Sequence, residues 1–279
     1  MTMIADPIAV MKRYELKYLL TAEQTAFFLE RLGGHMRMDQ YGLTTISSLY
    51  YDTPDRRLIR ASIDKGDFKE KIRLRSYGPA TDTSPVFLEL KRKADGIVYK
   101  RRVTTTVPQA KAFFAKQAPI GDGGQIDREI AYFRDFYGDL RPSCLILYDR
   151  VAYEDPHSDL RLTIDSAPRY RADDLDLRTG SQGVPLLPKG CTILEIKVQQ
   201  AMPLWLASAL DEGGIYKTSF SKYGEAYKRQ MTGQAAESPS IQREENVLCL
   251  RPFIPQPLPR VSSSPWPRPR WSPGCYSLG

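Results

Sequence analysis

Short segments in which apolar and charged residues alternate recur along the first 231 residues, and they restrict the fold more than any other feature. Successive side chains of a β-strand point to opposite faces, so each segment predicts a strand with one apolar and one charged face. Many strands with few long helices predict an antiparallel α+β protein, for which a barrel is one arrangement. The predicted strands are 12–20, 44–52, 69–77, 85–93, 97–107, 143–151, 160–166 and 191–198.

Helical patterns lie between and after these strands. Thr21 begins the first of them with a capping sequence, and Gly33-Gly34 ends it. Nine of the 21 prolines lie from Thr232 onward, and proline removes backbone donors that helices and sheets need. We therefore expect a folded unit at 10–231 and a disordered tail at 232–279. The predicted helices are 22–32, 108–117, 127–138, 203–212 and 221–231.

The charged faces of the predicted strands are mostly dense in Lys and Arg, with few neutral polar residues between them. In the strand 69–77, for example, Arg73 and Arg75 share one face. A single carboxylate lies among the cations on each of four strands. The recurrent cations are Lys17, Arg73, Arg75, Lys91, Lys100, Arg150, Arg161 and Lys197, and the carboxylates are Glu15, Glu89, Asp165 and Glu195.

The periodicity alone leaves two arrangements of these faces open. In an ordinary sandwich the charged faces would point to solvent and the apolar faces to the core. In a closed sheet with the charged faces inward, the cations would line a tunnel and repel one another unless a polyanion occupied it. Arg and Lys suit phosphate oxygens, and a carboxylate among them would hold a divalent metal that bridges the phosphates. The scarcity of neutral residues and the single carboxylates favour the tunnel.

Two residues on these faces, and one on the strand 44–52, have a structural interpretation. For Asp165 we favour an ion pair with Arg150 or Arg161 over assistance to a metal. Glu89 stays open between a place around the metal and an ion pair with a lysine of its own or the preceding strand. Tyr50 is interpreted as a packing residue of its strand.

Composition narrows the compartment and the partners. The net charge of +7 is consistent with an anionic partner. No stretch approaches the roughly 18 consecutive apolar residues of a membrane span, and the first residues lack the pattern of a secretory signal. Four scattered cysteines and two histidines disfavour a disulfide framework and a zinc site, so we expect a reducing, cytoplasmic compartment.

Nine segments in a fixed order carry a resemblance to a known family. Over about residues 10–230, the chain resembles the VTC-type polyphosphate polymerase domain, within the CYTH-like triphosphate tunnel metalloenzymes. The resemblance implies an eight-stranded antiparallel tunnel barrel with surrounding helices. It also implies metal-dependent transfer of the γ-phosphate of ATP onto a growing inorganic polyphosphate chain. The segments are RYELKYLL, SLYYDTP, KIRLRSYG, FLELKRK, YKRRV, LYDRVAYE, RLTID, ILEIKV and SFSKYGEAY.

The resemblance also implies roles for residues at matching positions. Glu195 would be the ligand of a divalent metal, Mn²⁺ or Mg²⁺. Two sets of residues would bind the phosphates of ATP and polyphosphate. The set expected to be catalytic is Lys17, Arg73, Arg75, Lys91, Arg150 and Arg161, and the set expected to bind substrate is Lys100, Tyr148, Lys197, Lys217, Ser221 and Lys222.

Two departures from the family pattern bear on the reaction. Ser219 stands where the family has a basic residue, and Lys217 is considered in its place. The hydrolytic relatives have an E-x-E-x-K pattern, and in this chain Arg13 occupies its first acidic position. The loss of this carboxylate favours polymerase over hydrolase chemistry, because hydrolytic tunnels carry more carboxylates. The alternatives that stay open are a triphosphate or nucleotide hydrolase of the same fold and a non-catalytic polyphosphate-binding module.

Nucleic acid is not expected as a partner. Binding of single strands predicts aromatic residues among the basic ones for base stacking, but the inward faces offer only Phe87 and Tyr148. The family's larger assemblies suggest a membrane-protein partner, although we expect no transmembrane segment in the chain itself.

Overall fold

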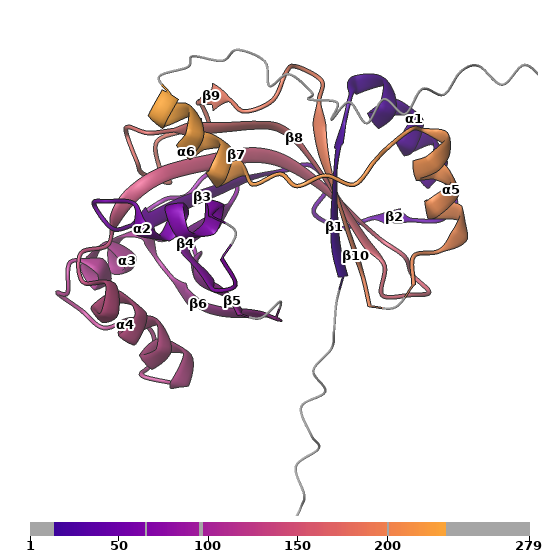
Figure 1. Cartoon of the computed structure of the whole chain (residues 1–279). Coiled ribbons are helices and arrows are strands. Elements are labelled where there is room, and N and C mark those ends of the chain that lie inside the picture. The colour runs from indigo at the N-terminus through magenta and orange to yellow at the C-terminus, as the bar shows by residue number, and fades with distance from the viewer. Residues whose placement is uncertain (1–13, 65, 95–96, 200, 233–279) are drawn as a thin grey trace, which may run out of the picture. The chain divides into compact units, whose positions relative to one another are not determined.

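The computed structural model describes residues 14–64, 66–94, 97–199 and 201–232, which lie in one compact unit of the chain (Figure 1). The predicted tail at 232–279 lies outside these residues, except for Thr232, as do residues 10–13 of the predicted folded unit. Two short strands, β2 (Arg37–Met38) and β9 (Val184–Pro185), pair with the main strands β7 and β8. The eight main strands in the described residues are β1 (Tyr14–Leu20), β3 (Thr44–Asp52), β4 (Lys69–Tyr77), β5 (Val86–Ala94), β6 (Ile97–Thr105), β7 (Arg141–Glu154), β8 (Arg161–Arg171) and β10 (Thr192–Val198).

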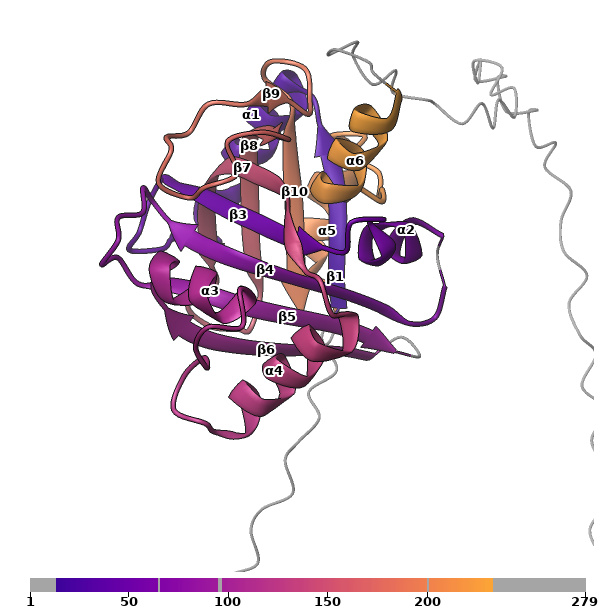
Figure 2. The same ribbon diagram turned by 90° about the vertical axis from the view of Figure 1, so that its left-hand side faces the viewer.

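These strands form one antiparallel sheet in the order β1-β10-β8-β7-β3-β4-β5-β6, and the sheet curls strongly (Figures 1 and 2). Within the described ranges β1 and β6 do not pair with each other, so the curl stays open along one side. The predicted antiparallel α+β fold with eight main strands is confirmed, in the form of a half-barrel. β7 and β8 extend further than expected, to Glu154 and Arg171.

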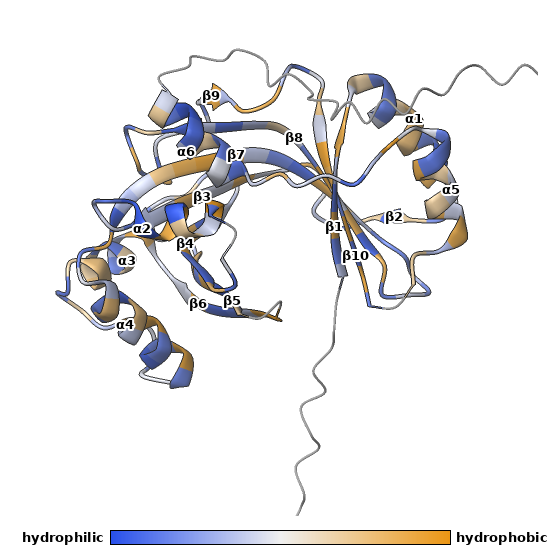
Figure 3. Ribbon diagram, viewed as in Figure 1, coloured by the Kyte–Doolittle hydropathy of each residue, from blue (hydrophilic) through white to orange (hydrophobic). Residues whose placement is uncertain are grey.

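The described residues contain six helices, namely α1 (Ala22–Leu32), α2 (Arg57–Ile63), α3 (Val107–Phe114), α4 (Gln125–Tyr137), α5 (Leu204–Glu212) and α6 (Lys222–Thr232). α1 and α5 cover the apolar face of β1, β10 and β8, while α3 and α4 cover that of β3, β4 and β5. Phe28 on α1 and Phe113 on α3 are fully buried, and burial of each such side chain contributes about 1.5–3 kcal/mol. Figure 3 shows hydrophobic and hydrophilic residues following one another along the strands. The apolar half of the alternation therefore forms the cores behind the sheet.

Local sequence explains α1 but not α2. The Thr21 hydroxyl accepts a hydrogen bond from the Gln24 amide at 3.2 Å, which confirms the predicted cap. α2 was not predicted, because its N-terminus is held from outside the helix: the buried Asp52 carboxylate accepts hydrogen bonds from the amides of Leu58 and Ile59. None of the helices in the described part of the chain is long and apolar enough to cross a membrane.

The face of the sheet that carries Arg75, called the inner face below, lies on the inside of the curl. Burial lowers the pKa of Lys71 on β4, and Lys17 on β1 lowers it further, although β10, β8, β7 and β3 separate these strands in the sheet. Charges on such distant strands interact because the curl turns them toward one another. α6 covers part of this face, where Tyr223 stacks on Tyr50 with ring centroids 4.3 Å apart.

Candidate functional site

The strand register gathers the polar side chains of the inner face into a broad band across the strands, called the row below. Lys17 on β1 lies opposite Glu195 on β10, which in turn lies opposite Thr163 on β8. At the other end of the sheet, Arg73 on β4 lies opposite Glu89 on β5. Directly opposed residues of antiparallel strands share a face, with Cβ atoms about 4.5–5.5 Å apart. Residues that are far apart in the sequence therefore become neighbours on this face.

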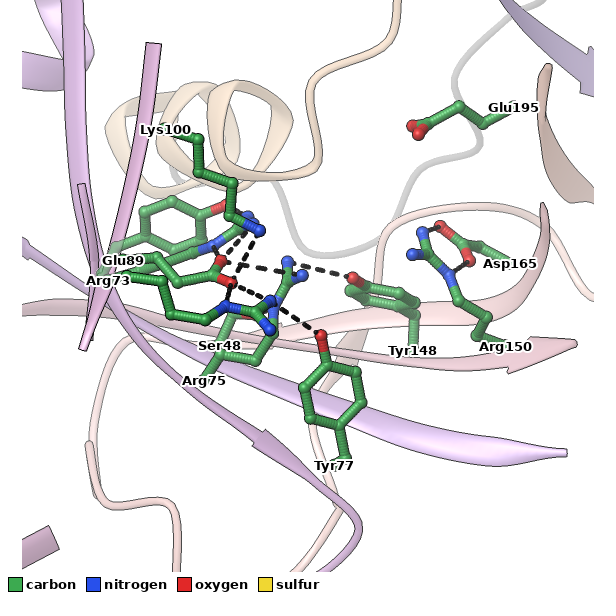
Figure 4. A network of polar contacts seen from close by, with 12 residues as sticks. Ser48, Arg73, Arg75, Tyr77, Glu89, Lys100, Tyr148, Arg150, Asp165 and Glu195 are labelled. Carbon is green, nitrogen blue, oxygen red and sulfur yellow. Dashed lines mark hydrogen bonds and ion pairs between the residues drawn. The ribbon is translucent and has the colours of Figure 1, made fainter. Parts of the chain in front are cut away.

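Glu89 is the centre of a group of four cations that we call the Glu89 cluster (Figure 4). Its carboxylate accepts hydrogen bonds from Arg73 at 2.8 Å and Arg102 at 2.8 Å, and it contacts Lys100 at 2.9 Å and Arg75 at 3.7 Å. Burial alone would raise the pKa of Glu89, but the nearby cations, foremost Arg73 and Arg75, hold it well below its usual range. Of the two interpretations left open for Glu89, the structure shows the ion pair, but with the four cations of this cluster in place of a lysine of its own or the preceding strand.

Asp165 forms a second buried ion group on the inner face. Arg150 donates two hydrogen bonds to its carboxylate, at 2.6 and 2.8 Å, and Lys222 at the start of α6 donates a third at 2.6 Å. Of the two predicted partners, Arg150 is therefore confirmed, whereas Arg161, the first residue of β8, is exposed and contacts Glu154. The ring of Tyr148 lies between this group and the Glu89 cluster, with the Lys222 ammonium 4.3 Å from its centroid (Figure 4).

Glu195 lies between two lysines at the other side of the row. Its carboxylate is 2.5 Å from the Lys197 ammonium and 3.4 Å from that of Lys17. Burial would raise the pKa of Glu195, but Lys197 and Lys17 hold it well below its usual range. The ionised carboxylate is thus available as a ligand, and the side chain of Thr163 opposite it is buried.

The residues around Glu195 fit a divalent metal only if phosphate or water completes the shell. No group of three or more His, Cys, Asp or Glu side chains gathers anywhere in the described residues. Mg²⁺ in phosphate-transfer sites commonly uses one or two carboxylates together with substrate oxygens. One ionised carboxylate beside a buried hydroxyl is consistent with that kind of site.

Lys71 and Lys91 are lysines of the inner face that lack a carboxylate partner among the described side chains. Lys71 donates to the Ser221 hydroxyl at 3.4 Å, and Lys91 lies opposite it on β5. Burial and the positive charge of Lys91 both lower the pKa of Lys71. This end of the inner face therefore has positive charge that the protein itself does not compensate.

The predicted site residues fall into two groups by position. Lys217 is not brought to the inner face: it pairs with Tyr18, whose side chain packs behind the sheet, and it is exposed. Arg161 and Lys197 lie opposite each other near one end of the row, and Lys91 and Lys100 do so near another. The residues that the fold gathers on or over the inner face are Lys17, Arg73, Arg75, Lys91, Lys100, Tyr148, Arg150, Arg161, Glu195, Lys197, Ser221 and Lys222.

Tyr50 is a polar member of the site that sequence reasoning missed. Its hydroxyl accepts a hydrogen bond from Arg73 at 2.9 Å, and its side chain is buried. Burial raises the pKa of a tyrosine, but Arg73, Lys71 and Arg75 outweigh it and lower the pKa of Tyr50 to about 8. The strand 44–52 has no charged face, so the only signal was that Ser48 and Tyr50 share one parity.

We expect one tyrosine of the free protein to ionise near pH 8, because the cations around Tyr50 favour its phenolate. An ultraviolet absorbance titration of the wild-type chain should show this early step, and Tyr50→Phe should remove it. Tripolyphosphate should shift the step to higher pH by offsetting the cations. A wild-type titration with no tyrosine ionising below the ordinary value of about 10 would contradict this expectation.

Comparisons with known proteins give one family match and several solved structures of low similarity. The family described as the VTC domain matches residues 12–231, whereas no curated protein matches the chain. A proposed adenylate cyclase from Vibrio parahaemolyticus is 11% identical, with 78% of this chain and 98% of that chain covered and a TM-score of 0.43. A proposed adenylate cyclase from Bacillus halodurans is 14% identical, with 75% of this chain and 94% of that chain covered and a TM-score of 0.46. A proposed adenylyl cyclase from Hippeastrum, described as having a dominant triphosphatase activity, is 16% identical. The alignment covers 81% of this chain and 98% of that chain, with a TM-score of 0.45.

Proposed function

This chain belongs to the VTC domain family, and on that premise we propose that it is a polyphosphate polymerase that transfers the γ-phosphate of ATP to inorganic polyphosphate. The observation that carries the proposal is the charge balance of the inner face. Glu89, Asp165 and Glu195 each contact two or more cations already, while Lys71 and Lys91 have no carboxylate partner in the described residues. Converging cations are stabilised when an extended polyanion lies among them.

The ion groups would orient the cations before substrate arrives. Arg73 and Arg75 are held by Glu89, and Arg150 is held by both oxygens of Asp165, so each guanidinium keeps a fixed direction. Donors that are already in place stabilise developing charge without reorganisation. Phosphoryl transfer depends mainly on such positioning and neutralisation. Lys222 would add a further cation from α6, which packs over the same face.

Glu195 would hold the divalent cation, Mn²⁺ or Mg²⁺, which when bound neutralises charge on the transferred phosphoryl group. Lys17 and Lys197 flank that carboxylate, so phosphate oxygens that approach it also meet two ammonium groups. The acceptor is the terminal phosphate of a chain and is already anionic, so no general base is needed. His35 stacks on Trp205 behind the sheet, away from the inner face.

Incubation of the full chain with ATP and Mn²⁺, followed by gel detection of polyphosphate and assay of free phosphate, tests the proposal. We expect polymer to accumulate together with ADP. Free phosphate equal to ADP without polymer would instead establish a hydrolase, and binding of polyphosphate without ADP release would establish a binding module. Arg73→Gln should abolish polymer formation, whereas Arg141→Gln, which alters an exposed arginine at the start of β7, should not.

A further inference from the structure

Thr163 on β8 carries a buried hydroxyl that the protein does not use. The residue is only 9% exposed, and its Oγ1 atom has no hydrogen-bond partner in the described part of the chain. Buried polar groups are nearly always paired, because an unpaired one loses its hydrogen bonds to water without replacement. Valine has nearly the same shape and is likewise enriched in strands. The unpaired hydroxyl therefore slightly lowers the stability of the free protein. A hydrogen-bond partner for it would come from a bound ligand.

The neighbours of Thr163 show what that partner would meet. Glu195 lies opposite Thr163 on β10, and its carboxylate forms ion pairs with two lysines. Ala152 lies opposite Thr163 on β7 and has no polar side-chain atom. The carboxylate of Asp165, two residues further along the strand, accepts hydrogen bonds from Arg150 and from a lysine of α6. A buried hydroxyl elsewhere on the inner face does have a partner: Ser48 on β3 accepts a hydrogen bond from Arg75 at 3.3 Å.

We propose that Thr163 is a further substrate-binding residue, whose hydroxyl donates a hydrogen bond to a phosphate oxygen of the bound triphosphate or polyphosphate chain. The inference rests on the part of the proposed function in which the inner face binds a phosphate chain. Phosphate oxygens are strong acceptors and attract donors that stand among cations. Thr163 lies directly opposite Glu195, which Lys17 and Lys197 flank. Arg150 lies opposite Asp165, two residues from Thr163 on the same face of β8, so a phosphate chain held by these cations would pass beside the threonine.

The test compares affinity for tripolyphosphate in the presence of EDTA, by calorimetry, for the wild type, Thr163→Val and Thr163→Ser. We expect Thr163→Val to weaken binding about tenfold, the usual scale for a hydrogen bond to a charged group, and Thr163→Ser to remain within about twofold of the wild type. Without ligand, Thr163→Val should melt at the same temperature as the wild type or higher. A purely structural threonine would give the opposite result, with lower stability and unchanged affinity.

Thr45→Val provides the matched control, because the Thr45 hydroxyl already donates to Asp149 at 2.7 Å. It should lower the melting temperature and leave tripolyphosphate affinity unchanged. The inference is overturned if Thr163→Val binds tripolyphosphate in EDTA as tightly as the wild type, or if Thr163→Ser loses as much affinity. A wild type that fails to bind tripolyphosphate overturns it together with the proposed function. A wild type that binds and loses affinity on Thr163→Val but makes no polymer overturns only the proposed function.

Discussion

Replacing Glu195 with glutamine should slow phosphoryl transfer by about 1000-fold, since a bound metal contributes several kcal/mol and each 1.36 kcal/mol is a factor of ten. Glutamine keeps the shape of the side chain but removes the charge that a divalent cation needs. The same change frees Lys17 and Lys197 from their shared carboxylate. We therefore expect ATP to bind at least as tightly in EDTA while the rate with Mn²⁺ collapses. Single-turnover kinetics with Mn²⁺ and calorimetry in EDTA measure the two effects separately.

Glu15→Gln is the matched control for this variant. Glu15 also contacts Lys17, at 3.2 Å, but its side chain is 37% exposed at the edge of the sheet. Exposed ion pairs contribute little, so this variant should keep a rate within about threefold of the wild type. Polymer formation by Glu195→Gln at the wild-type rate with Mn²⁺ present would show that the metal is held elsewhere.

Replacing Glu89 with glutamine should lower the free energy of unfolding by about 3 kcal/mol, the lower end of the cost of breaking a buried ion pair. Four cations share this carboxylate, and their mutual repulsion is uncompensated without it. The cost stays at the lower end because Lys100 and Arg102 remain partly in contact with water. Tripolyphosphate should restore most of the loss, since it binds the folded state and supplies negative charge.

Urea unfolding with and without tripolyphosphate measures this effect, and its pH dependence gives an independent check. The pKa of Glu89 is depressed in the folded state, so its contribution is present above the ordinary value of 4.5 and is lost as the pH falls below it. The wild type should therefore lose stability in that acidic range more steeply than Glu89→Gln. Glu154→Gln, which alters an exposed carboxylate, should match the wild type. Equal stability of Glu89→Gln and the wild type at neutral pH would contradict the expectation.

Features that depend on nearby residues could be predicted from the sequence. The two faces of β4 follow from side chains two positions apart, so Arg73 and Arg75 were assigned to one face without knowledge of the other strands. The cap of α1 depends only on Thr21 and Gln24, which are three residues apart. The boundaries of most strands and the family resemblance follow from the same local patterns.

Features that depend on the register between strands could not be predicted in this way. Glu89 is paired with cations of both neighbouring strands rather than with Lys91 or Lys71, because strand pairing places Arg73 and Arg102 directly opposite it. Tyr50 and Thr163 are uncharged, and only their neighbours on other strands show that one contacts an arginine and the other lacks a partner.

The alternation by itself therefore determined that the chain forms strands with one cationic and one apolar face. It did so because the direction of a strand side chain is a local property of the backbone. Only the tertiary structure decided that the cationic faces turn toward one another, that α6 covers part of them and that Lys217 lies elsewhere. These outcomes depend on the curl of the whole sheet and on the packing of helices behind it, which are contacts between residues distant in the sequence.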